Sequence, residues 1–153
     1  MRLILLTFML ASSLMSQELK IKANQFNTDE KAGVSVFQGK VNMVKASDEI
    51  NASKITVYTD KERKPTKFIA QGDVSFNLMT KEGAIYKGKA GKVIYKPKDK
   101  EYYFFDDVHL LQIGDKKEII GDEVVLKMTE GKAYAKGVEN EPVIMIFNMP
   151  EEK

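Results

Sequence analysis

The side chains best suited to chemistry are few and lie apart. His109 is the only histidine among 153 residues, and there is no cysteine, so thiolate metal sites and cysteine nucleophiles are excluded. Asp106 and Asp107 lie beside His109 and raise the question of a metal site. In an extended strand, Asp107 and His109 share one face while Asp106 points to the other. At most two ligands would converge, so we predict no metal site.

The sequence contains no recognisable catalytic arrangement. No serine lies in a nucleophile-elbow motif, and no glycine-rich loop of the phosphate-binding kind is present. A Ser-His-Asp arrangement is excluded unless His109 is its base. We therefore predict neither catalytic residues nor a cofactor. An enzyme with an unrecognised site is the weakest alternative.

Charge is abundant but balanced. The chain has 24 lysines and arginines against 22 acidic residues, a formal net charge of +2, so no overall field attracts nucleic acid or a membrane surface. Arg2 and Arg63 are the only arginines, fewer than proteins that bind phosphate bidentately usually carry. We predict no nucleic-acid partner.

The N-terminus has the three-part layout of a secretory signal peptide. Arg2 supplies positive charge, residues 3–11 are mostly apolar, and residues 12–16 include three serines with small side chains. We predict a signal peptide over residues 1–16, with cleavage after Ser16 or Ser13, and export to the periplasm. An uncleaved anchor and a buried N-terminal helix are the alternatives.

The rest of the chain has the pattern of short strands. Apolar and polar residues alternate with period two, most clearly in residues 41–44, 55–58 and 74–78. Turn-forming residues recur between such segments, as in 60–65 and 97–100. We predict one all-β domain over residues 17–148 and a short polar tail over 149–153.

The strands recur as a repeated unit. Similar strand openings occur at residues 37–41, 70–74 and 105–108. Between them a second strand recurs at residues 50–57, 86–95 and 119–126. Such a repeat indicates stacked strand pairs that bury their apolar faces against their neighbours. Small residues fit places where the sheet bends or backbones approach closely: Gly39, Gly72, Gly88, Ala90 and Gly121.

Stacked strand pairs would place alternate side chains on one continuous apolar interior. In phase with Phe76, the inward positions are Ile21, Val41, Met43, Ile55, Val57, Val74, Phe76, Leu78, Val93, Tyr95, Val108, Leu110, Val124 and Leu126. These side chains either line an open trough or fill a closed core, and the pattern alone leaves both interpretations open.

The first and last strands would lack a neighbour within the chain. These predicted edge strands cover residues 19–26 and 142–147. Pairing with another molecule by strand addition would involve Leu19, Ile21, Ala23, Val143, Ile144 and Ile146. An internal position for the second strand is the alternative.

The order and spacing of these strands resemble one family. A Gly-Asn-Val-like opening followed by an Ile-x-Ala/Gly-Asp-x-Val-x-Tyr-like strand is similar to the LptA/OstA-like periplasmic proteins of lipopolysaccharide export. The most similar segments are residues 19–24, 88–90, 93–95, 107–112 and 120–124. Two features depart from the family: Asp106 replaces the usual glycine, and the polar C-terminal tail is nearly absent.

The resemblance implies a twisted β-jelly-roll of repeated antiparallel strand pairs, open along one side. Its trough would hold the lipid A acyl chains of lipopolysaccharide. Copies, or the inner-membrane and outer-membrane jelly-roll proteins of the export machine, would stack end to end into a bridge powered by an inner-membrane ATPase. Lysines near turns would meet head-group phosphates: Lys81, Lys87, Lys89, Lys116 and Lys117.

A lipid with several acyl chains needs a carrier to cross water, because each lipid methylene exposed to water costs roughly 0.8 kcal/mol of free energy. Such a protein needs an apolar lining and an opening, but no catalytic group. Two other functions remain open. One is a membrane-anchored jelly-roll subunit of the same export machine. The other is a structural module that polymerises by edge pairing without binding lipid.

Overall fold

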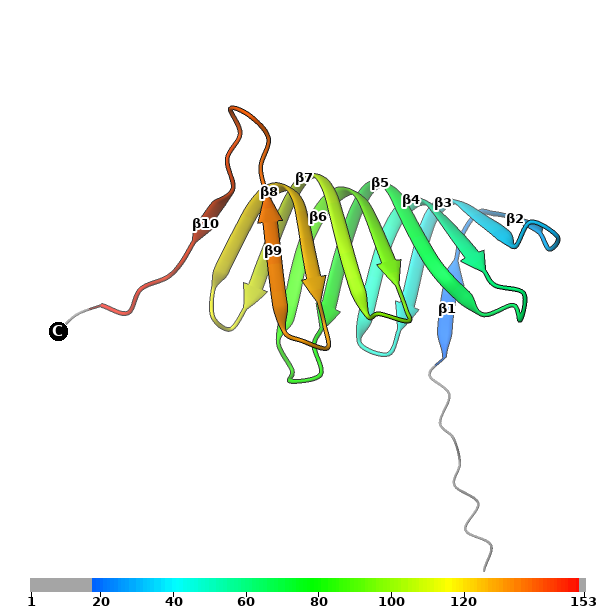
Figure 1. Ribbon diagram of the computed structural model, residues 1–153, viewed down its shortest axis with the longest axis horizontal. Coiled ribbons are helices and arrows are strands. Elements are labelled where there is room, and N and C mark those ends of the chain that lie inside the picture. The colour runs from blue at the N-terminus through cyan, green and yellow to red at the C-terminus, as the bar shows by residue number, and fades with distance from the viewer. Residues whose placement is uncertain (1–17, 152–153) are drawn as a thin grey trace, which may run out of the picture.

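The computed structural model describes residues 18–151, and all ten strands in this range belong to one antiparallel sheet (Figure 1). The strands are β1 (Leu19–Lys22), β2 (Gln25–Asp29), β3 (Val34–Lys45), β4 (Asp48–Thr59), β5 (Pro65–Met79), β6 (Ile85–Lys96), β7 (Glu101–Ile113), β8 (Lys117–Lys127), β9 (Lys132–Lys136) and β10 (Ile144–Ile146). The predicted all-β fold is confirmed. The described residues contain no helix long and apolar enough to span a membrane. The predicted signal peptide lies outside them.

A line of bends crosses the six long strands β3 to β8. At this line the pairing register shifts in every adjacent pair. Three of the strands carry two consecutive residues with positive φ there: Gly39 and Lys40, Gly72 and Asp73, and Asp106 and Asp107. Such bulges bend a strand sharply. Asp106 adopts a φ of 67° where the other two strands have glycine, and aspartate tolerates this region better than most residues.

The bends divide the sheet into two facing walls. Wall A contains β1, residues 41–45, 48–52, 74–79, 85–90, 108–113 and 117–121, and β10. Wall B contains β2, residues 34–38, 54–59, 65–71, 92–96, 101–105 and 123–127, and β9. Each hairpin turn from β2 to β9 joins strands of the same wall. Within residues 18–151, no backbone therefore closes the side opposite the bends.

Small residues let the walls come together at the bend. The bend pairs a valine with a small residue three times: Val41 with Ala52, Val74 with Ala90, and Val108 with Gly121. Farther along the interior, the rings of Phe76 in wall A and Phe104 in wall B lie 4.4 Å apart between centroids. The two walls thus share one apolar core.

The N-terminal edge consists of two strands, so the prediction of one strand over residues 19–26 is wrong. β1 and β2 both pair with β3, one in each wall. Ala23 and Asn24 separate them and belong to neither strand. The Asn24 N–H donates to the carbonyl oxygens of Gln38 and Gly39, at 3.1 and 3.0 Å. The edge therefore bends with the rest of the sheet.

The C-terminal edge is also double, with β9 and β10 both paired to β8 (Figure 1). The predicted strand over residues 142–147 is too long, because β10 covers only Ile144–Ile146. Val143 precedes it and is half-buried beside Gly121. β9 was not predicted, although its sequence, Lys-Ala-Tyr-Ala-Lys, alternates with period two.

Candidate functional site

The interior between the walls contains the residues predicted to face inward. Thirteen of the fourteen side chains are buried, and the exception, Ile21 on the edge strand β1, is half-buried and packs against them. The structure therefore places the predicted set in one apolar cluster. Contact of these residues with a lipid stays a prediction.

Sequence reasoning missed seven members of the same cluster. They are Ile50, Ala52, Phe68, Ala70, Ala90, Tyr102 and Phe104. The bend is one reason, because it changes the phase of alternation within a strand. In β4, Ala52 and Ile55 both face inward although they are three residues apart. Small residues at the bends of the strands other than β7 were the available signal for this shift.

The middle of the interior is closed. Phe76 is only 5% exposed and packs on Phe104, which is fully buried. Leu78 and Leu110 are also almost completely buried. Between these residues the two walls form a packed core and leave no open trough.

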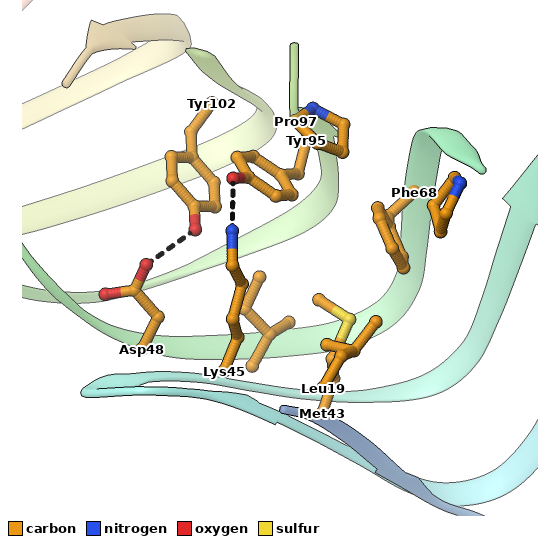
Figure 2. A pocket seen from close by; sticks show the side chains of 10 residues that line it. Leu19, Met43, Lys45, Asp48, Phe68, Tyr95, Pro97 and Tyr102 are labelled. Atoms are coloured by element: carbon orange, nitrogen blue, oxygen red, sulfur yellow. Dashed lines mark hydrogen bonds between the residues drawn. The ribbon is translucent and has the colours of Figure 1, made fainter. Parts of the chain in front are cut away.

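Near β1 the walls separate and leave an apolar cavity of about 290 Å³ (Figure 2). Wall A contributes Leu19, Met43 and Ile50. Wall B contributes Phe68, whose ring lies 5.9 Å from the ring of Tyr95. Phe68 was not predicted, yet it is one of the aromatic residues that line this space.

Two hydrogen bonds cross from one wall to the other at the cavity (Figure 2). Tyr102 Oη donates to Asp48 Oδ2 at 2.9 Å, and Lys45 Nζ donates to Tyr95 Oη at 3.2 Å. Asp48 Oδ1 also accepts from the backbone N–H of Met79, at 2.9 Å. Burial raises the pKa of Tyr102, and the negative charge of Asp48 raises it further. Tyr102 thus keeps its proton and acts as the donor.

A second space, of about 450 Å³, continues along the open side. Its lining includes Lys45, Lys81 and Lys100, together with Asp48. Lys81 was predicted to lie at such a rim, whereas Lys45 and Lys100 were not. Lys87 and Lys89 are exposed on β6, Lys116 lies in the β7–β8 turn, and Lys117 begins β8. The structure brings only one of the five predicted lysines to this opening.

The acidic pair near His109 does not follow simple alternation. Asp106 and Asp107 are both exposed, and both have positive φ. The expectation that they point to opposite faces assumed a regular strand, and a bulge between Phe105 and Val108 interrupts the strand there. Within residues 18–151 no three histidine or acidic side chains are placed to hold a metal ion.

A comparison with protein-family models places the sequence in a known group. The family described as LptA/(LptD N-terminal domain) LPS transport protein matches residues 20–132, from β1 to the start of β9. The chain belongs to this family. A search of curated proteins found no match.

The fold of this LptA-family chain is similar to a solved structure. That structure is LptH from Pseudomonas aeruginosa, described as the LptA-homologous periplasmic component of the lipopolysaccharide transport device. The TM-score is 0.77, with 16% sequence identity, over 87% of this chain and 96% of LptH. At this identity the likeness shows the fold alone, and it confirms the predicted jelly-roll.

Proposed function

We propose that this protein is a periplasmic carrier of lipopolysaccharide that shields acyl chains between its two walls. The observation that carries the proposal is an apolar interior between two walls, with a cavity near β1, in a member of a lipopolysaccharide transport family. The description of LptH as periplasmic and the signal-peptide pattern before residue 17 support the compartment.

Loading would require the walls to move apart, since Phe76 and Phe104 now close the middle of the interior. The backbone hydrogen bonds of the long strands run between neighbours within each wall. Hinging at the bend line therefore leaves those bonds intact and breaks side-chain contacts. An acyl chain would replace these contacts with apolar contacts of its own, at roughly 0.8 kcal/mol per buried methylene.

End-to-end assembly is the second part of the proposal. Each end of the sheet has unpaired backbone groups in both walls, along β1 and β2 at one end and β9 and β10 at the other. Apolar side chains are exposed at both ends, including Phe26 at 56% and Ile144 at 48%. Such edges pair readily with another strand. A second copy, or a jelly-roll protein of either membrane, would supply it.

Photo-crosslinking in the native host tests lipid binding. We would replace Phe68, which lines the cavity, with p-benzoylphenylalanine. Tyr58 is the matched control, because it lies on the neighbouring strand and alternates with the inward Val57. We expect lipopolysaccharide adducts at position 68 and few at position 58. Adducts at neither position, in a folded and exported protein, would favour a closed core and an edge-pairing structural module.

A further inference from the structure

The cavity near β1 is held closed by polar contacts as well as apolar ones. The bonds of Tyr102 to Asp48 and of Lys45 to Tyr95 join wall B to wall A. Among residues 18–151 no other side-chain hydrogen bond or ion pair links the two walls. Both bonds lie at the same place, beside the cavity (Figure 2). We call this pair of bonds the latch.

We propose that the cavity binds one acyl chain of an anionic amphiphile, and that the latch must open to admit it. The inference rests on the proposed function and assigns to it a first binding position and a gate.

The lining of the cavity fits an alkyl chain. Leu19, Met43, Ile50 and Phe68 present hydrocarbon, and Leu19 is 36% exposed at the edge of the sheet. The cavity therefore borders solvent at the edge of the sheet, whereas Phe76 in the middle is enclosed.

Lys45 suits an anionic head group. Its ammonium group now donates to a neutral phenol oxygen and lies 5.4 Å from the centroid of the same ring. The bond from Lys45 to Tyr95 has one charged partner, whereas an ammonium paired with a carboxylate or phosphate gains the attraction of two opposite charges. An anionic head group would thus compete for Lys45 and release Tyr95. Lys81 and Lys100 line the adjoining space and would add to the attraction.

Aromatic rings connect the cavity to the closed middle. Tyr95 and Tyr102 stack with centroids 4.4 Å apart, and Tyr102 lies 6.1 Å from Phe104. Phe104 in turn packs against Phe76 at 4.4 Å. Release of Tyr102 from Asp48 frees the ring that stands between the cavity and this core. Asp48 would keep its bond from the Met79 N–H.

Stopped-flow fluorescence with dansyl-labelled undecanoic acid tests the latch. Tyr102→Phe keeps the ring and removes the donor, so we expect the probe to associate about tenfold faster, as suits the loss of one hydrogen bond to a charged group. Tyr95→Phe removes the other bond and should act in the same direction. Tyr103→Phe is the control, because Tyr103 lies on the same strand and bonds Glu101 within wall B. Equal rates for the wild type and both latch variants, all folded by thermal unfolding, would overturn the latch.

Two further variants test the position of the chain and the head group. Leu19→Trp should fill the cavity and weaken binding of the probe at least tenfold, at about 1.4 kcal/mol per factor of ten. Lys45→Gln should remove the preference for this probe over the same alkyl chain with a quaternary ammonium head. Unchanged binding in Leu19→Trp would overturn the site. If lipopolysaccharide crosslinks to p-benzoylphenylalanine at position 76, in the middle of the interior and outside the cavity lining, while these variants behave as wild type, the inference fails and the proposed function stands.

Discussion

At the scale of single residues, Tyr102 combines apolar and polar contacts in one side chain. It is 3% exposed, stacks on Tyr95 and donates to Asp48. This hydrogen bond satisfies the buried phenol group of Tyr102. Without a partner, the phenol group would lower the free energy of unfolding by about 1–3 kcal/mol. Tyr102 therefore ties the stability of the core to the latch.

The raised pKa of Tyr102 predicts a loss of stability at alkaline pH. An unfolded tyrosine loses its proton near pH 10, whereas folded Tyr102 retains it. The contribution of Tyr102 is thus complete below about pH 10 and falls above it by about 1.4 kcal/mol per pH unit. Urea unfolding at several pH values measures this slope. We expect a shallower slope in Tyr102→Phe, and equal slopes would contradict the raised pKa.

At the scale of the strands, the bends decide the shape of the molecule. Gly72 has a φ of +82°, and a Cβ there would lie 2.7 Å from Ser53 Oγ on the neighbouring strand. The same Ser53 hydroxyl donates to the Gly72 carbonyl oxygen at 3.2 Å. The bend thus requires glycine both for its conformation and for the close approach of β4.

Gly72→Ala and Gly83→Ala separate these two requirements. Gly83 has a similar φ of +90°, but nothing lies within 4 Å of a Cβ there. We expect Gly83→Ala to lower the free energy of unfolding by about 1 kcal/mol, from its left-handed conformation alone. Gly72→Ala should lower the free energy of unfolding by about 1–3 kcal/mol more than Gly83→Ala, because the new Cβ would overlap with Ser53.

Urea denaturation measures both glycine variants, and Ser53→Gly should recover part of the loss in Gly72→Ala. Equal losses at the two positions would show that close approach at the bend contributes nothing.

At the scale of the whole molecule, the two ends of the sheet differ from its faces because the end strands have unpaired backbone groups. Ile144 and Ile146 on the edge strand β10 are 48% and 44% exposed. Leu111 and Ile113 on the interior strand β7 are 42% and 41% exposed. Exposure alone does not distinguish these pairs, but only β10 lies at an end with unpaired backbone groups.

Lysine substitutions at these positions test end-to-end stacking. Ile144→Lys with Ile146→Lys should weaken concentration-dependent self-association at least tenfold, since charge on an edge strand opposes strand addition. Leu111→Lys with Ile113→Lys should leave it unchanged. Sedimentation velocity over a range of concentrations makes the comparison. A larger effect of the second pair would place the contact on the face of wall A.

The sequence by itself determined the class of fold and the direction of many side chains. Period-two alternation and the repeated strand openings predicted an all-β fold of stacked strand pairs, and the family resemblance implied the jelly-roll. The phase of Phe76 predicted inward positions on both sides of the bends. These features are local, because a strand has its two faces before it meets a partner. The glycines at 39 and 72 likewise marked the bends, since their conformation is a property of single residues.

Only the tertiary structure decided how the interior is divided. The closed middle depends on Phe76 and Phe104 meeting across the walls, and the latch joins Asp48 to Tyr102, 54 residues apart. Alternation shows that a side chain faces inward but not which side chain of the opposite wall it meets. Which side chains meet across the walls depends on the angle of the bend. It also depends on how the side chains fill the space between the walls at close-packed density.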